Sequence, residues 1–221
     1  MASFEFRFWE DRLSPGMTAT ASRGANRVVY VVEGDATIGA QALSANGACH
    51  IAGPVTVSAG GSGARAWRWE LIAGEDESAL VAGAEPQPVS RLVFIQPIDL
   101  DPTRAYLMRC DRVDFPLGGV AYTHTHQGPG IRCLIRGRLT VETHGRTMPI
   151  RPGEAWFESG PEPVDAKASD TELTSFVRVM ILPAQLIGKS SIRYVNAEGQ
   201  GKPKTQSYTV FVDQPIANGP A

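Results

Sequence analysis

The chain has little of what several common protein classes require. Its three cysteines, Cys49, Cys110 and Cys133, are odd in number and form no C-x-x-C pair, which argues against a disulfide framework and fits buried thiols in a reducing cytosol. No run approaches the roughly 18 apolar residues of a membrane-spanning helix. The formal net charge is −2, so we expect no partner among nucleic acids or anionic membranes.

Targeting signals and several enzyme motifs are also missing. The first residues, MASFEFRFWEDRLSPG, contain no cationic start followed by an apolar core, so we expect no signal peptide and a cytoplasmic location. The chain has no G-x-S-x-G elbow, no glycine-rich phosphate loop leading into a helix and no zinc-finger spacing. These absences exclude the common hydrolase, nucleotide-binding and zinc-finger patterns.

Glycine and proline, by contrast, are plentiful. The chain holds 23 glycines and 16 prolines among its 221 residues. Such a content is typical of many short strands joined by tight turns. The composition therefore predicts an all-β fold.

The most informative stretch runs from residue 119 to 137, GVAYTHTHQGPGIRCLIRG. Successive side chains of a strand point to opposite faces, so His124 and His126 lie on the same face, about 7 Å apart along the strand. Two imidazoles aimed at one point are suited to binding a metal ion. The alternative is that both histidines are merely polar surface residues.

A second block follows, GRTMPIRPGEAWFESG at residues 145–160, with a Pro-Gly turn at Pro152 and Gly153. The order of glycine, H-x-H, β-run, glycine and Pro-Gly turn resembles the two motifs of the cupin superfamily of small β-barrels. The resemblance spans nearly the whole chain. It implies cupin-type barrels (a double-stranded β-helix, or jelly roll) and places the family's metal-ligand histidines at His124 and His126.

The resemblance is incomplete at the metal site. The family's glutamate would fall at Gly130, or at Ile131 with the longer spacing, and its third histidine would fall at Val164. Two of the four customary ligands therefore remain, and an imidazole pair binds a divalent metal weakly unless other donors join. The metal itself, iron, nickel, manganese or zinc, is left open.

Two residues are candidates for the missing ligands. The amide oxygen of Gln127, directly after His126, reaches a metal only if the strand bends at the following glycines; otherwise Gln127 is a turn residue facing solvent. Glu158 lies on the strand after the Pro-Gly turn. A carboxylate on an inward face must be paired or coordinated. The alternative for Glu158 is a surface position.

Arg132, Tyr122 and Trp156 are candidates for substrate binding. Alternation from the inward histidines puts Arg132 inward as well, where a buried guanidinium needs a bidentate acceptor such as Glu158 or a substrate carboxylate. If the glycine-rich turn shifts the phase, Arg132 lies on the surface. Tyr122 and Trp156, with Phe157, would enclose a small organic ligand. No catalytic residue is assigned.

The same unit occurs twice along the chain. RVVYVVEGDATIG at residues 27–39 parallels GIRCLIRGRLTV at residues 130–141, with Gly34 aligned to Gly137. The alignment places His124 on Ala21 and His126 on Arg23, so the first copy has no metal pair. This repeat predicts a bicupin whose first barrel is degenerate and structural.

We expect the first barrel at residues 1–75, a linker at residues 76–90 rich in acidic residues, glycine and proline, and the second barrel at residues 91–221. Near the C-terminus, SYTVFVDQP alternates as a strand that must pair with its own barrel or with a neighbouring subunit. We therefore expect a homodimer.

Two functions follow from these observations. In the first, the second barrel binds a divalent metal and acts as an oxygenase or isomerase on a small anionic or carbonyl compound, with the ion as a Lewis acid. In the second, the barrel binds a small ligand without metal or chemistry, and its histidines only form hydrogen bonds. The fold hosts both kinds of protein, so whether the chain is an enzyme stays open.

Overall fold

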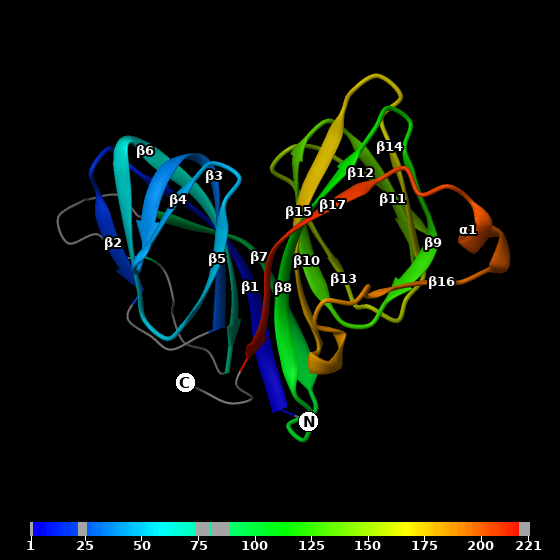
Figure 1. Ribbon diagram of the computed structural model, residues 1–221, viewed down its shortest axis with the longest axis horizontal. Helices are drawn as coiled ribbons and strands as arrows, with labels where there is room; N and C mark the ends of the chain where they lie inside the picture. The colour runs from blue at the N-terminus through cyan, green and yellow to red at the C-terminus, as the bar shows by residue number, and fades with distance from the viewer. Residues whose placement is uncertain (1, 22–25, 74–79, 81–88, 217–221) are drawn as a thin grey trace. The chain divides into compact units, whose positions relative to one another are not determined.

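The computed structural model describes residues 2–21, 26–73, 80 and 89–216. Nearly all regular structure in these residues is β-strand (Figure 1). The chain divides into two compact units, Met1–Ala105 with Gln214–Ala221, and Tyr106–Asp213. The predicted all-β fold class is confirmed.

The first unit is one seven-stranded antiparallel sheet. Its path runs β4-β3-β6-β1-β7, with β2 paired to β6 and β5 paired to β3. The strands are β1 (Ala2–Leu13), β2 (Thr18–Ala21), β3 (Asn26–Ile38), β4 (Gln41–Ser44), β5 (Ala48–Ala52), β6 (Val55–Ile72) and β7 (Ser90–Leu100). Long β6 pairs with three strands, which lets one sheet close around a core.

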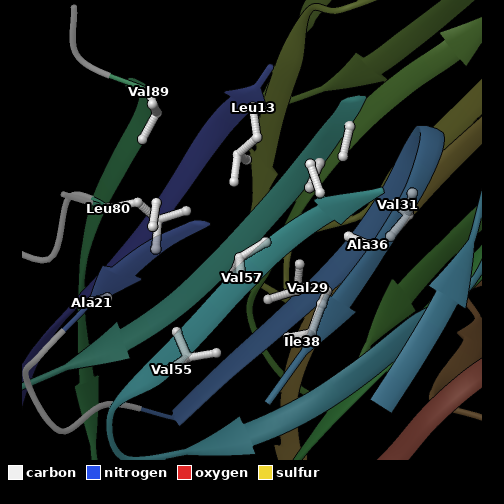
Figure 2. Packing of buried hydrophobic residues seen from close by; sticks show 14 of the residues in the cluster. Leu13, Ala21, Val29, Val31, Ala36, Ile38, Val55, Val57, Leu80 and Val89 are labelled. Atoms are coloured by element: carbon white, nitrogen blue, oxygen red, sulfur yellow. The ribbon is translucent and has the colours of Figure 1, made fainter. Parts of the chain in front are cut away.

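The core of this unit is aliphatic and built from small side chains. Val29, Val31, Val57 and Ile38 pack together with Leu13 from β1 (Figure 2). The β3 residues Val29 and Val31 are two apart, as the period of a strand requires for side chains that share a face. Burial of these side chains is the main source of the unit's stability.

Charged side chains on the same faces of β3 and β6 form a buried network of ion pairs. Arg27 on β3 and Arg68 on β6 both contact the Glu70 carboxylate, and Arg68 also binds Asp11 through Nε at 2.7 Å and Nη2 at 3.0 Å. All four side chains are buried. Two cations and two anions balance each other, so the first unit neutralises its interior with its own residues.

The second unit consists of two five-stranded sheets, ordered β13-β10-β15-β8-β17 and β12-β11-β14-β9-β16. Their strands curve around a common interior (Figure 1). The elements are β8 (Tyr106–Phe115), β9 (Val120–His126), β10 (Gly130–Arg136), β11 (Leu139–Thr143), β12 (Arg146–Ile150), β13 (Ala155–Glu158), β14 (Val164–Ala168), β15 (Thr174–Pro183), the 3₁₀ turn η1 (Ala184–Leu186), β16 (Ile192–Tyr194), α1 (Ala197–Gly201) and β17 (Ser207–Ile216).

Gly137, which closes the first motif, ends β10 in a conformation that favours glycine. Its φ is +77°, and a Cβ there would lie 2.4 Å from Thr174 Oγ1 and 2.6 Å from the carbonyl oxygen of Leu173. A side chain is thus excluded by both backbone strain and contact with the start of β15. The turn that this glycine permits lets the chain leave β10 and enter β11 in the other sheet.

Unit boundaries differ from the sequence-based expectation at two places: the start of the second unit, and Gln214–Ala221, which group with the first unit. Strand β7 pairs with β1 from Ala2 to Asp11, so it belongs to the first unit. The second unit therefore begins at Tyr106, later than the expected residue 91, because the edge of β1 takes up the extra strand. Of the expected linker at 76–90, residues 76–79 and 81–88 lie outside the described residues. The alternating C-terminal segment forms β17, which pairs with β8.

Candidate functional site

The two histidines of the H-x-H pair meet inside the second unit. Both lie on β9, both are buried, and their Nε2 atoms are 3.2 Å apart. The rings stand edge to face, with their centroids 4.8 Å apart. The predicted shared face is therefore observed, and the imidazoles converge more closely than the spacing of their backbone atoms alone would suggest.

Each imidazole is oriented through its other nitrogen. His124 Nδ1–H donates to the carbonyl oxygen of Tyr122 at 2.8 Å, which leaves Nε2 of the neutral ring unprotonated. His126 Nδ1 lies 3.4 Å from Ser191 Oγ. Partners of this kind fix the ring and the tautomer of metal-binding histidines. Both Nε2 atoms are therefore held toward the same space.

Glu158 reaches this space from the neighbouring sheet. Its Oε2 lies 3.3 Å from His126 Nε2 and 2.7 Å from Arg132 Nη2, while its Oε1 accepts a hydrogen bond from Trp156 Nε1 at 2.8 Å. Despite these short distances, neither Glu158 Oε2 nor Arg132 Nη2 has a well-aligned hydrogen bond to any described residue. The two atoms are close but poorly directed, so both keep capacity for another partner.

Burial sets the charges of the two imidazoles. The pKa of His126 is lowered to about 3, chiefly by removal from water and also by Arg132 and Arg178, while the Glu158 carboxylate opposes this lowering only in part. Burial also lowers the pKa of His124. Both rings are therefore neutral at physiological pH, and each keeps one nitrogen lone pair; in the hydrogen bond between the two Nε2 atoms, one of these nitrogens carries the proton.

The two groups of the Glu158–Arg132 pair remain charged. Burial raises the pKa of Glu158, but the Arg132 guanidinium, the adjacent His126 imidazole and the hydrogen bond from Trp156 outweigh it and hold that pKa well below its usual range. Burial lowers the pKa of Arg132 to about 10, which still leaves it protonated at neutral pH. The site therefore contains a carboxylate and a guanidinium beside two neutral imidazoles.

A second buried ion pair borders the site. Arg178 on β15 lies opposite Arg132 on β10 and binds Asp111 on β8 through Nε at 2.7 Å and Nη2 at 3.2 Å. Burial acts to lower the pKa of Arg178, but Asp111 outweighs it and raises that pKa. With both pairs balanced, the site carries no net charge before a ligand binds.

These groups line a cavity of about 20 Å³, which has room for roughly one water molecule. Most of the wall is apolar or aromatic, including Phe115, Trp156 and Phe176. The polar side chains that line it are His124, His126, Arg132, Glu158, Arg178 and Gln206, together with the hydroxyl-bearing Tyr208. A single ion fits this space, whereas a larger ligand enters only if a wall residue moves.

The positions where the cupin motifs carry their other ligands cannot supply donors. A Cβ on Gly130 would lie 2.8 Å from Met180 Cγ, 2.8 Å from the carbonyl oxygen of Val179 and 2.9 Å from Arg132 Nη1. Val164, paired with His124 across β14 and β9, lines the cavity as an apolar residue. Glu158 lies directly across from Gly130, so a carboxylate enters the site from β13 where the motif would provide it from β10.

The other predicted site residues lie in different surroundings. Trp156 lines the cavity, as expected. Tyr122 does not line it: its carbonyl oxygen holds His124, while its ring lies 4.9 Å from the Lys202 ammonium. Gln127 is also outside the lining, because its Oε1 accepts a hydrogen bond from Arg193. A metal ligand at Gln127 would need that bond to break.

Several residues of the site were missed by the sequence analysis. Arg178 and Asp111 are charged residues within otherwise largely apolar stretches, SFVRVMILP and YLMRCDRVDF, and that contrast was a usable signal. Ser191, which contacts His126, and the cavity-lining Gln206 and Tyr208 follow the barrel motifs in the chain; they reach the site because β16 pairs with β9 and β17 pairs with β8. No local pattern points to them.

Within the described part of the chain, no group of three or more His, Cys, Asp or Glu side chains is already arranged to hold a metal ion. The histidines supply two donors, and Glu158 Oε2, which lies 3.3 Å from His126 Nε2, is shared with Arg132. The unused capacity of that oxygen and the two neutral imidazoles nevertheless fit a divalent cation.

No protein-family model matches the chain, and no curated protein sequence does. Solved structures do. The chain is similar to a tryptophan-to-phenylalanine variant of Bacillus subtilis oxalate decarboxylase, with a TM-score of 0.63 and 12% identity over 89% of this chain and 73% of that one. The fold is cupin-like.

Two further structures give the same result. One, from a study of the Mn(II) centres of the same Bacillus subtilis decarboxylase, has a TM-score of 0.64 and 11% identity over 89% of this chain and 73% of that one. The other is a glycine-to-alanine variant of salicylate 1,2-dioxygenase from Pseudoaminobacter salicylatoxidans, with a TM-score of 0.53 and 14% identity over 92% and 74%. At these identities the likeness establishes the fold.

None of the helices in the described residues is long and apolar enough to cross a lipid bilayer.

Proposed function

We propose that the second unit binds one divalent metal ion through His124 and His126, with Glu158 as the third protein ligand. The observation that carries this proposal is the 3.2 Å separation of the two Nε2 atoms, in neutral rings whose other nitrogens are held by Tyr122 and Ser191. Two ligands that each lie about 2.1 Å from one ion are roughly 3.0 to 3.4 Å apart. The separation of His126 Nε2 from Glu158 Oε2, 3.3 Å, falls in the same range.

Two histidines and one carboxylate form a ligand set that leaves positions open for a substrate. The structurally similar oxalate decarboxylase has Mn(II) centres, and salicylate 1,2-dioxygenase acts on another small carboxylate, as their names state. By analogy, we propose an oxygenase or isomerase for a small anionic or carbonyl compound. The bound metal would act there as a Lewis acid.

The residues of the chain have separate tasks in this proposal. Arg132 Nη2, which has unused hydrogen-bonding capacity, would bind the anionic group of the substrate. Phe115, Trp156 and Phe176 exclude water from the cavity. The Trp156 indole holds one oxygen of Glu158, which leaves the other oxygen to turn between Arg132 and the metal.

One observation favours the alternative of a ligand-binding barrel without metal. Arg132 Nη2 lies 2.7 Å from Glu158 Oε2, so the guanidinium already neutralises the carboxylate that the metal needs. In that case the cavity would hold a small polar ligand, and the two histidines would serve as hydrogen-bonding groups.

The measurement that decides between the two is elemental analysis of the purified, untagged protein after dialysis without chelator. The proposal expects close to one equivalent of manganese, iron, nickel or zinc per chain. It expects no second ion, because the sequence alignment puts Ala21 and Arg23 at the equivalent positions of the first unit; Arg23 lies outside the described residues. No metal as purified, and none taken up on addition, would leave the metal-free alternative.

We also propose a homodimer. Strand β17 lies at the end of its sheet and exposes Val210, whose exposed fraction is 55%. An edge strand of this kind offers unpaired backbone groups to a second chain. Light scattering coupled to size-exclusion chromatography measures the mass directly, and a monomer at micromolar concentration would refute the dimer.

A further inference from the structure

Two uncharged polar residues near the start of β17, Gln206 and Tyr208, line one part of the cavity wall. Gln206 directly precedes the strand, and Tyr208 is its second residue. Both line the cavity, and Gln206 Nε2 donates to the Tyr208 hydroxyl at 3.0 Å. The hydroxyl accepts this bond, so its own proton is free to be donated.

The Gln206 side chain is buried but only half satisfied. Its exposed fraction is 8%, and Oε1 has no hydrogen-bond partner among the described residues. If the amide were turned by 180°, the nitrogen would take the place of the unpaired atom, so one polar atom stays unpaired in either orientation. A buried amide without its partner costs roughly 1–3 kcal/mol, which favours a ligand that supplies one.

Like Gln206, the Arg132–Glu158 ion pair of the same cavity contains buried polar atoms without a hydrogen bond to any described residue. Among the described residues, the buried polar atoms without a hydrogen bond include Arg132 Nη2 and Glu158 Oε2, and all three side chains line the same cavity. One small space is therefore bordered by a cationic donor that is ion-paired with Glu158 but lacks a well-aligned hydrogen bond, and by an amide atom without a hydrogen-bond partner among the described residues. A ligand that satisfies both needs an anionic oxygen and, near it, a hydrogen-bonding group.

Tyr208 stands where the cavity meets solvent. It is the exposed member of the lining described by the structure, with an exposed fraction of 41%. Its ring lies 5.5 Å from the Arg178 guanidinium, a contact typical of a cation–π pair. Since the cavity holds only about one water, a ligand of several atoms must displace this ring to enter.

We propose that Gln206 and Tyr208 determine specificity at this site, and that they select a small 2-hydroxycarboxylate such as glycolate. The carboxylate would bind Arg132, and the hydroxyl would pair with the Gln206 amide while Tyr208 closes over it. This inference rests on the proposed function insofar as it places the ligand in the same cavity. It adds the ligand class and two residues that the cupin motifs do not contain.

A hydroxyl suits the Gln206 position because it is neutral, donates to an amide oxygen and accepts from an amide nitrogen or from Tyr208. An unsubstituted carboxylate such as acetate leaves the amide unpaired.

The test compares glycolate with acetate, which differ by this hydroxyl. Binding to the protein as purified is measured by isothermal titration calorimetry, and the metal content of the same samples is determined. The wild-type protein should bind glycolate at least about tenfold more tightly than acetate, since a buried hydrogen-bonding group left unpaired costs a factor of that order. In Gln206→Leu the two affinities should agree within about twofold, with acetate binding unchanged.

Two further variants keep the test decisive. Gln200→Leu, exposed on α1 and absent from the lining, should keep the full preference. If the leucine variant does not fold, Gln206→Glu, which is close in size to glutamine, replaces it. The added carboxylate should weaken the binding of both glycolate and acetate, because like charges repel. Equal binding of both acids by the wild type, binding of neither, or a preference that survives in Gln206→Leu would each overturn the inference.

The outcomes also separate this inference from the metal site. A glycolate preference that disappears in Gln206→Leu, in protein that contains no metal and takes none up on addition, would support recognition by Gln206 and refute the proposed metal site. One equivalent of metal without any preference would support the metal and refute the recognition.

Discussion

Gly130 and Glu158 are directly paired across the antiparallel strands β10 and β13. Paired residues of neighbouring strands place their side chains on the same face of the sheet. A carboxylate on β13 can thus approach the histidines although β10 carries a glycine at the matched position. The surroundings of Gly130, packed against Met180 and the backbone of Val179, explain why β10 itself does not hold the carboxylate.

The first prediction concerns Gly130. Gly130→Ala should lower the free energy of unfolding by about 1–3 kcal/mol, because the added methyl group would lie 2.8 Å from both Met180 Cγ and the carbonyl oxygen of Val179. Gly61→Ala is the control, since a Cβ there meets nothing within 4 Å. Urea denaturation of both variants measures the difference; equal stabilities would show that the space around Gly130 is not restrictive.

The second prediction concerns the metal ligands. The double variant His124→Ala/His126→Ala should lose bound metal and keep its fold, because two donors are removed from a three-ligand set. His144→Asn is the matched control: His144 lies in an exposed turn with a φ of +51°, which asparagine tolerates. Elemental analysis and circular dichroism follow both properties. Unchanged metal content in the double variant would rule out this assignment.

The third prediction concerns pH. Burial holds the pKa of His126 at about 3 in the folded protein, against about 6.5 in an unfolded chain. Between these values the unfolded chain binds a proton that the folded chain does not, so stability falls as the pH is lowered through this window. The loss from His126 is at most about 1.4 kcal/mol per pH unit.

Denaturation of chelator-treated protein at pH 6 and pH 5 measures this dependence. His126→Gln, which cannot titrate, should lose less stability over the same interval than the wild type. The same loss in both proteins would mean that His126 is not the group responsible.

The fourth prediction concerns the ion pair of Arg178 and Asp111. Both side chains are almost fully buried, with exposed fractions of 5% and 2%. Asp111→Ala should therefore lower the free energy of unfolding by about 3–5 kcal/mol, because it leaves a guanidinium buried without its partner. Asp170→Ala removes the exposed pair with Lys167 and should cost less than about 1 kcal/mol. Similar losses in the two variants, measured by urea denaturation, would contradict the prediction.

The sequence predicted those parts of the site that depend on local periodicity. Strand alternation placed His124 and His126 on one face and, with an uninterrupted phase, Arg132 inward; the inward position of Trp156 came from the family resemblance. Alternation did not place Tyr122 or Gln127, since the bond from Arg193 to Gln127 depends on β16 pairing with β9. Gln206 and Tyr208 were missed because a strand remote in sequence brings them to the site.

The domain boundary shows the same limit. Residues 91–100 carry a clear strand pattern, but periodicity does not say which partner a strand chooses. The long β1 offers a free edge, and β7 fills it.

The hydrogen bond from Trp156 to Glu158 has a practical consequence. Trp156 is the single tryptophan between Tyr106 and Asp213, since the other three of the chain are Trp9, Trp67 and Trp69. Its indole lines the cavity and touches the carboxylate that a ligand would engage. With those three replaced by phenylalanine, the tryptophan fluorescence, excited selectively over that of the five tyrosines, would come from Trp156 alone, so occupancy of the cavity could be followed without a label.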